Sequence, residues 1–258
     1  LGKIENVVLG FNQLEDYVTD SPYFGAFVGR VAGRIADGVW SGYQLTKNEG
    51  EHHIHGGNRT FSQGVWDSRV VKEQDKIGVS FSFVSPDGDN GYPGNLSVTV
   101  TYYWTNDNVW EMLITAKSDQ ETLFNPTNHT YFNLSGQTKR NVLNHTLQME
   151  AANYAETNES KLPTGRLLPV AQTAFDFREP KKMDLAIQDR PVGFDTPFKL
   201  SGNKTIRLDD PDSGRILKME TNREAVVVFS TTGMEEEYLV DGEKMSSHRG
   251  IALETQEL

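Results

Sequence analysis

The chain has 258 residues, 36% hydrophobic and 24% charged, with a formal net charge of −11 at pH 7. This composition is typical of a globular protein and excludes the disordered and fibrous classes, while the acidic balance argues against a nucleic-acid-binding surface, which needs clustered lysine and arginine. The absence of cysteine excludes disulfides, thiolate metal ligands and cysteine nucleophiles, and it fits a cytoplasmic protein.

Alternating apolar and polar residues predict β-strands along most of the chain. In IGVSFSFV, residues 77–84, Ile77 and Phe81 share one face while Ser80 lies on the other, and LSVTVTY at 96–102 alternates in the same way. The same pattern predicts later strands in VWEMLITAKS (109–118), HTLQMEA (145–151), GRILKMETN (214–222), AVVVFSTT (225–232) and GIALETQ (250–256).

The links between these strands favour an antiparallel arrangement. DGDNG at 87–91 places glycine after aspartate or asparagine, as tight turns require. Only QLEDYV (13–18) and KKMDLAI (181–187) suggest a helical turn or two. We therefore predict an all-β fold, a large antiparallel β-sandwich, with residues 1–258 forming a single domain.

Three histidines crowd into EGEHHIHGG, residues 49–57. On an extended segment His53 and His55 would point to the same face, a spacing that suits zinc or copper. A metal site needs a third ligand, and no spacing motif supplies one from His129 or Glu51. The favoured interpretation is that one histidine contacts a polar ligand, the others are solvated, and no metal binds.

Two further polar residues lie on predicted strands. His129 shares a face with Tyr131, while Phe132 points to the opposite face and the core. In GIALETQEL, Ile251 and Leu253 share one face and Glu254 lies on the other. His129 could be a structural residue whose hydrogen bonds are satisfied, and Glu254 could simply be solvated. Either residue could instead be catalytic. The residues alone leave both open.

The chain resembles the aldose 1-epimerases, or galactose mutarotases. The resemblance rests on motifs that follow family order over nearly the whole chain: VVLGFNQLEDY, YFGAFVGRVAGRIADG, HHIHGG, GYPGNL, NPTNHTYFNLSG, LPTGRLLPV with FDFREP, VGFDTPFKL and GIALETQ. The resemblance implies a large antiparallel β-sandwich, sometimes called a supersandwich, which agrees with the strand pattern.

The resemblance also implies residue roles. His129 matches the general acid of the family and Glu254 its general base. His55 matches a second histidine that hydrogen-bonds the sugar near the reacting centre, and Arg34 and Asp195 match residues that bind sugar hydroxyls.

This chain departs from the family pattern in three respects. Gly33 stands where the family often has asparagine, and the usual PDA continuation after ETQ is missing. The resemblance also implies an N-terminal strand region and closing strands that this sequence does not contain, so residues 1–258 are expected to form a single domain that lacks its N- and C-terminal segments.

The implied reaction interconverts the α and β anomers of free aldohexoses such as galactose and glucose. Removing the C1 hydroxyl proton and protonating the ring oxygen opens the ring, and this needs two proton carriers but no cofactor and no metal. The chain accordingly carries no dinucleotide-binding or phosphate-loop motif. Candidates for stacking on the sugar are Phe229, Tyr131 and Trp66.

Two alternatives stay open. A relative acting on hexose 6-phosphates would need basic residues at the pocket mouth, for which Arg59, Arg69 and Arg178 are candidates. A carbohydrate-binding β-sandwich without turnover would not need a matched acid and base. The expected partner is a small sugar; a nucleic acid or membrane is not expected, since the longest apolar runs, such as 225–229, are too short to span a bilayer. The protein is expected to be a monomer or homodimer.

Overall fold

A computed structural model describes residues 3–19, 22–58, 61–236 and 239–258. The chain divides into two compact units, one formed by Leu1–Val28 with Asn125–Leu258 and the other by Gly29–Phe124. That the chain forms a single domain stays a prediction.

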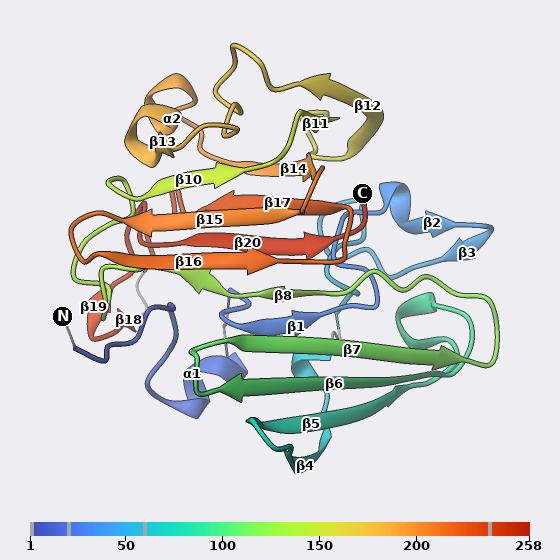
Figure 1. Cartoon of the computed structure of the whole chain (residues 1–258). Helices are drawn as coiled ribbons and strands as arrows, with labels where there is room; N and C mark the ends of the chain where they lie inside the picture. The colour runs from blue at the N-terminus through green and yellow to red at the C-terminus, as the bar shows by residue number, and fades with distance from the viewer. Residues whose placement is uncertain (1–2, 20–21, 59–60, 237–238) are drawn as a thin grey trace. The chain divides into compact units, whose positions relative to one another are not determined.

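Two antiparallel sheets form the body of the first unit (Figure 1). The six-stranded sheet contains, in spatial order, β12 (Pro163–Pro169), β11 (Asn153–Thr157), β14 (Asp195–Lys199), β17 (Ala225–Ser230), β20 (Ile251–Gln256) and β9 (Tyr131–Phe132). The four-stranded sheet contains β13 (Lys181–Lys182), β10 (Thr146–Met149), β15 (Thr205–Asp210) and β16 (Arg215–Glu220).

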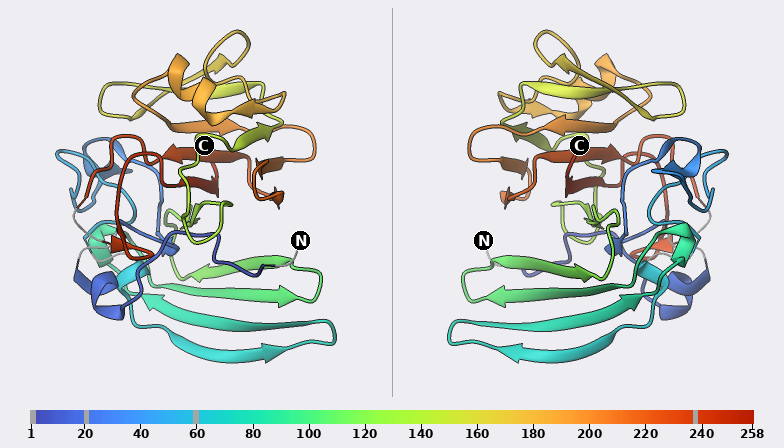
Figure 2. Two further views of the ribbon diagram at one scale, coloured as in Figure 1. Left: turned by 90° about the vertical axis from the view of Figure 1, so that its left-hand side faces the viewer. Right: turned by 90° about the vertical axis from the view of Figure 1, so that its right-hand side faces the viewer.

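One hydrophobic core joins these two sheets. The strands of both sheets can be followed in the turned views of Figure 2. Val228 on β17 and Leu253 on β20 point into it from the six-stranded sheet, and Leu147 on β10 and Leu208 on β15 point into it from the four-stranded sheet. All four side chains are at most 3% exposed. A core shared by two antiparallel sheets makes this unit a β-sandwich.

Shorter elements complete the first unit. They are β1 (Ala26–Val28), which pairs with β8 (Thr127–His129), the hairpin of β18 (Leu239–Val240) and β19 (Glu243–Lys244), and the helices α1 (Leu14–Thr19) and α2 (Met183–Asp189). The two helices lie where short helical segments were predicted. No helix in the described part of the chain is long and apolar enough to cross a membrane.

The second unit is built on a four-stranded antiparallel sheet. Its strands are β4 (Asp67–Lys72), β5 (Lys76–Ser85), β6 (Leu96–Thr105) and β7 (Trp110–Ser118). Beside them are β2 (Val39–Trp40), β3 (Tyr43–Gln44) and the short 3₁₀ helices η1 (Ala36–Gly38), η2 (Phe61–Gln63) and η3 (Asp89–Gly91).

The turn predicted at 87–91 is confirmed, because Gly88, Asn90 and Gly91 all have positive φ. The simple division of β5 into a buried apolar face and an exposed polar face is wrong at two positions. Ile77 is 51% exposed, while Ser80 is 5% exposed and accepts a hydrogen bond from Thr101.

Candidate functional site

The face of the six-stranded sheet opposite the core carries two of the predicted site residues, Asp195 and Glu254, and two of the aromatic candidates, Phe229 and Tyr131. Strand register places Asp195 beside Phe229, Phe229 beside Ala252, and Ala252 beside Tyr131, in one row across the sheet. Because side chains alternate along a strand, Glu254 follows Ala252 on this face. The predicted face of Glu254 is confirmed, but the glutamate is 4% exposed rather than solvated.

His129 and Glu254 are in contact. Nε2 of His129 lies 3.4 Å from Oε1 of Glu254, and their side chains are 6% and 5% exposed. β8, which carries His129, is held on its other side by β1, with Ala26 opposite His129. Two titratable groups are therefore brought together and largely removed from water, an arrangement that costs desolvation free energy unless the groups compensate each other.

Aromatic rings surround the His129 imidazole. The Tyr131 ring lies 4.9 Å away between centroids, the Tyr23 ring stacks on it at 5.9 Å and 27°, and Phe229 meets it edge-on at 6.4 Å. Tyr131 and Phe229 were candidates from the sequence, whereas Tyr23 was missed. Tyr23 has a φ of 65° just before β1, and nothing in the local pattern signals that it lies against a histidine far along the chain.

Asp195 begins β14, two strands away from Glu254 and offset from it by two residues along the strands, so roughly 12 Å from it. Its carboxylate lies 3.0 Å from Nζ of Lys161, and the aspartate side chain is 22% exposed. Lys161, in the turn before β12, was not predicted. Strand alternation places Asp195 on the same face as Glu254, and the ion pair orients its carboxylate, part of which stays open to solvent.

Arg34 and His55 belong to the second unit. Nε and Nη2 of Arg34 donate to the two carboxylate oxygens of Glu49 at 2.5 and 2.9 Å, and the arginine side chain is 12% exposed. This two-bond contact fixes the plane of the guanidinium group. Glu49 lies within the histidine-rich stretch but was not predicted as a partner.

His55 lies in a tight turn rather than on an extended segment, so the expectation that it shares a face with His53 is wrong. The Gly57 amide donates to the Ile54 carbonyl at 3.0 Å, and φ is 53° at His55 and 86° at Gly56. Nδ1 of His55 lies 2.8 Å from the Ala32 carbonyl. Because a carbonyl only accepts, Nδ1 carries the hydrogen, and Nε2 of the neutral ring is an acceptor.

The other two histidines of the cluster have separate local partners. His53 is fully buried, which corrects the expectation of a solvated residue; Nδ1 donates to the Thr46 carbonyl and Nε2 accepts from Tyr92. Burial lowers the pKa of His53. The Asp37 amide donates to Nδ1 of His52. In the described ranges, no group of three or more histidine, aspartate or glutamate side chains could hold a metal ion.

The remaining candidates from the sequence are a tryptophan that could stack on the sugar and three arginines that could bind a 6-phosphate. Trp66 donates to the Phe61 carbonyl and packs against Phe83 within the second unit. Of the basic candidates, Arg178 forms two hydrogen bonds with Asp176, Arg69 lies on an exposed stretch of β4, and Arg59 lies outside the described residues.

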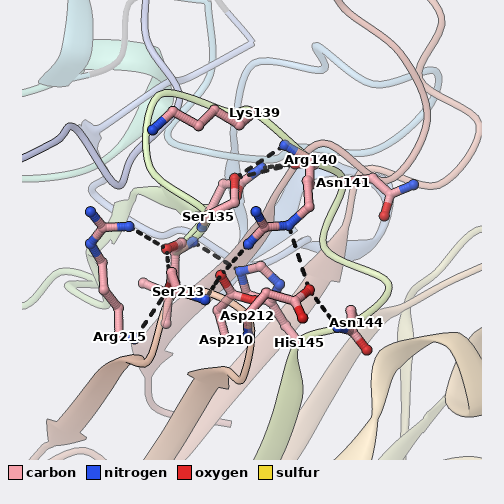
Figure 3. Close-up of polar contacts among 12 residues, drawn as sticks. Ser135, Lys139, Arg140, Asn141, Asn144, His145, Asp210, Asp212, Ser213 and Arg215 are labelled. Atoms are coloured by element: carbon pink, nitrogen blue, oxygen red, sulfur yellow. Dashed lines mark hydrogen bonds and ion pairs between the residues drawn. The ribbon is translucent and has the colours of Figure 1, made fainter. Parts of the chain in front are cut away.

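A separate polar cluster of the first unit surrounds the loop after β9 (Figure 3). Nη2 of Arg140 lies 2.8 Å from the carboxylate of Asp210, which is 1% exposed. Beside them, Nε2 of the buried His145 accepts from the Leu134 amide at 2.9 Å. Burial lowers the pKa of His145 to about 4, although the Asp210 charge acts in the opposite direction.

Comparisons with known proteins place the chain in a family. A solved galactose 1-epimerase from Lactobacillus acidophilus matches with a TM-score of 0.87 and 34% identity, covering 98% of this chain and 76% of that one. This match confirms the all-β fold class predicted from the sequence. The family model described as aldose 1-epimerase matches residues 1–258, and the chain belongs to the aldose 1-epimerase family.

Curated relatives agree with this assignment. Human galactose mutarotase is 40% identical over 267 residues, covering 99% of this chain and 76% of that protein. The aldose 1-epimerase of Haemophilus influenzae is 35% identical over 265 residues, covering 98% of this chain and 76% of that protein.

Proposed function

We propose that this protein is an aldose 1-epimerase that interconverts the α and β anomers of free aldohexoses such as galactose and glucose. The observation that carries the proposal is the contact between His129 and Glu254, at 3.4 Å on the face of the six-stranded sheet opposite the core that it shares with the four-stranded sheet. Family membership and the names of the relatives support the same activity.

The chemistry explains why an acid and a base need to lie this close. Ring opening removes a proton from the C1 hydroxyl and adds one to the ring oxygen, and both oxygens are bonded to C1. Two proton carriers acting on one carbon's substituents must converge within a few ångströms, as the functional atoms of His129 and Glu254 do.

In the proposed mechanism, the Glu254 carboxylate takes the C1 hydroxyl proton while the protonated His129 imidazole gives its Nε2 proton to the ring oxygen. The bond between C1 and the ring oxygen breaks and leaves an open-chain aldehyde. Rotation about the C1–C2 bond presents the other face of the carbonyl, and the reverse proton transfers close the ring as the other anomer. No step requires a cofactor or a metal.

Binding is assigned to three further residues. Asp195 would accept hydrogen bonds from sugar hydroxyls, Arg34 would donate them, and Nε2 of His55 would accept one near the reacting centre. Each has a local partner that orients it, namely Lys161, Glu49 and the Ala32 carbonyl. Oriented polar groups of this kind hold a substrate in a reactive position. Tyr131 and Phe229, against His129, would contact the apolar face of the ring.

The alternatives receive less support. Arg178, a candidate for binding a 6-phosphate, already directs Nε and Nη2 at the carboxylate of Asp176. A binding protein without turnover would gain nothing from placing two titratable side chains in contact at 4–5% exposure, since their burial costs free energy. A cytoplasmic location and a monomeric or homodimeric state, both expected from the sequence, complete the proposal.

Polarimetry on freshly dissolved α-D-galactose and α-D-glucose tests the activity. We expect the protein to accelerate equilibration of at least one sugar, and His129→Gln protein purified in parallel to serve as the control for contaminating enzyme. Equilibration at the uncatalysed rate for both sugars would reject the proposal. Acceleration confined to the 6-phosphates would favour the alternative substrate.

A further inference from the structure

The turn that carries His55 packs too closely on its neighbours to accept side chains at its glycines. A Cβ on Gly56 would lie 1.7 Å from the Gly29 carbonyl oxygen, and a Cβ on Gly57 would lie 2.3 Å from Oδ1 of Asn90. The turn is therefore in direct contact with two other segments of the second unit. One of these contacts is made by a polar side chain.

Asn90 joins this turn to the loop between β5 and β6. Its Oδ1 accepts a hydrogen bond from the Asn58 amide at 3.0 Å, directly after the turn, and its Nδ2 donates to Oδ1 of Asp89 at 3.0 Å. Both ends of the side-chain amide are used, each toward a different segment. Aspartate could not donate the second bond and would repel Asp89.

The link continues from Asp89 to a buried arginine. Oδ2 of Asp89 accepts from the Ser85 hydroxyl at 2.6 Å, and the same hydroxyl accepts from Nε of Arg30 at 3.0 Å. Arg30 is 2% exposed, and its other nitrogens donate to carbonyls at both ends of the loop, those of Ser85, Pro86, Pro93 and Gly94. The loop is therefore a fixed support, and hydrogen bonds arranged in such a chain strengthen one another.

We propose that Asn90 is a positioning residue for sugar binding: through the Asn58 amide it holds the His55 turn, and with it the direction of His55 Nε2. The inference rests on the proposed function, in which His55 contacts the sugar. It adds a residue that touches no substrate but determines how well one substrate contact is made.

The variant that tests this is Asn90→Gly. Asn90 has a φ of 48°, which glycine adopts without strain, and the backbone bond from the Thr46 amide to the carbonyl of residue 90 is retained. The matched control is Asn95→Ala on the same loop. This substitution removes the hydrogen bonds that the Asn95 side chain makes with Asp87 and Asp119. It leaves the contacts of the His55 turn in place.

The kinetic experiment is a double-mutant cycle with His55→Gln. Asn90→Gly should lower kcat/KM for galactose by about three- to tenfold, the effect of losing one hydrogen bond, while Asn95→Ala leaves it unchanged. In the His55→Gln background, Asn90→Gly should change kcat/KM by no more than about twofold, because the two residues act through one contact. The proposal would be overturned if Asn90→Gly had no effect on kcat/KM in the parent, or if it lowered kcat/KM as much in the His55→Gln variant as in the parent.

A second measurement separates failure of this inference from failure of the proposed function. Hydrogen exchange at the Asn58 amide, followed by NMR without sugar, should be about fivefold or more faster in Asn90→Gly than in the parent or Asn95→Ala. If the parent shows no mutarotation, the proposed function fails, and faster exchange would still support the turn-holding contact. Unchanged exchange at Asn58 would overturn the inference whatever the activity.

Discussion

Nε2 of His129 lies 3.4 Å from Oε1 of Glu254, and both side chains are almost completely buried on the face of the sheet opposite the hydrophobic core. Neither residue is close to the other in sequence. Because the two side chains are in contact and largely removed from water, they are expected to act as a unit in catalysis and in stability.

The first prediction concerns His129→Gln. Glutamine can form hydrogen bonds from a similar position but has no titratable group near neutral pH, so kcat for galactose should fall by ~10²–10⁴. Binding of galactose, measured by calorimetry, should persist. Thermal unfolding and kcat are measured on the same samples. A stable and fully active variant would show that another residue is the acid, and a large loss of stability with normal turnover per folded molecule would assign His129 a structural role.

The second prediction concerns Glu254→Gln and the double variant. Removing the base should lower kcat by the same order, ~10²–10⁴. Because acid and base act on one ring opening, the double variant should be little slower than the slower single variant, as is usual for groups that act as a unit. The three rate constants are compared by polarimetry. Multiplicative losses would mean that the two residues act in separate steps.

The third prediction separates binding from proton transfer at Arg34. Arg34→Ala should raise KM for galactose about tenfold or more, the effect of losing a charged hydrogen bond, with a much smaller change in kcat. Glu49 is 43% exposed at its side chain and can be hydrated when its partner is removed. Glu49→Gln, which keeps Arg34, should raise KM less. A collapsed kcat at unchanged KM would reverse the role assigned to the arginine.

The fourth prediction concerns stability in acid. Burial lowers the folded-state pKa of His145 from 6.5 to about 4, so the unfolded chain binds a proton that the folded protein does not bind between these values. The neutral His145 makes its full contribution to the free energy of unfolding above pH 6.5. This contribution is lost as the pH falls from 6.5 toward 4, and the loss reaches about 3 kcal/mol at pH 4.

Urea unfolding between pH 7 and pH 4 tests this contribution of His145. His145→Gln can still offer an oxygen to the Leu134 amide, which now bonds to Nε2, but does not titrate. The free energy of unfolding of this variant should therefore fall less steeply below pH 6.5 than that of the parent. Parallel curves for the two proteins would show that His145 is not the group responsible.

The fifth prediction is that chelators leave mutarotation unchanged, because proton transfer by His129 and Glu254 needs no metal. The histidine cluster is engaged locally, with His53 bonded to Thr46 and Tyr92 and His55 to Ala32. Rates are measured after dialysis against EDTA and again after adding zinc. Activity that disappears with EDTA and returns with zinc would contradict the mechanism.

Local alternation in the sequence was sufficient to assign faces to the strands that carry the proposed acid and base. Phe132 and Leu253 do point into the core of the first unit, which leaves His129 and Glu254 on the opposite face. This worked because the direction of a side chain on a strand depends only on its position in a two-residue repeat. The family motifs, likewise local, were enough to propose five site residues.

Local patterns failed where a partner comes from elsewhere in the chain. Tyr23 against His129, Lys161 beside Asp195 and Glu49 on Arg34 were not predicted. The extended conformation assumed for His55 was also wrong, because a turn with positive φ at His55 and Gly56 replaces it.

The sequence by itself therefore determined the fold class, the family and the face on which each proposed catalytic side chain lies. Only the tertiary structure decided that His129 touches Glu254, that Asp195 lies two strands away, and which groups orient each of them. The physical reason is that alternation within a strand fixes only the face of each side chain, whereas contacts between residues far apart in the chain depend on which strands pair and in which register.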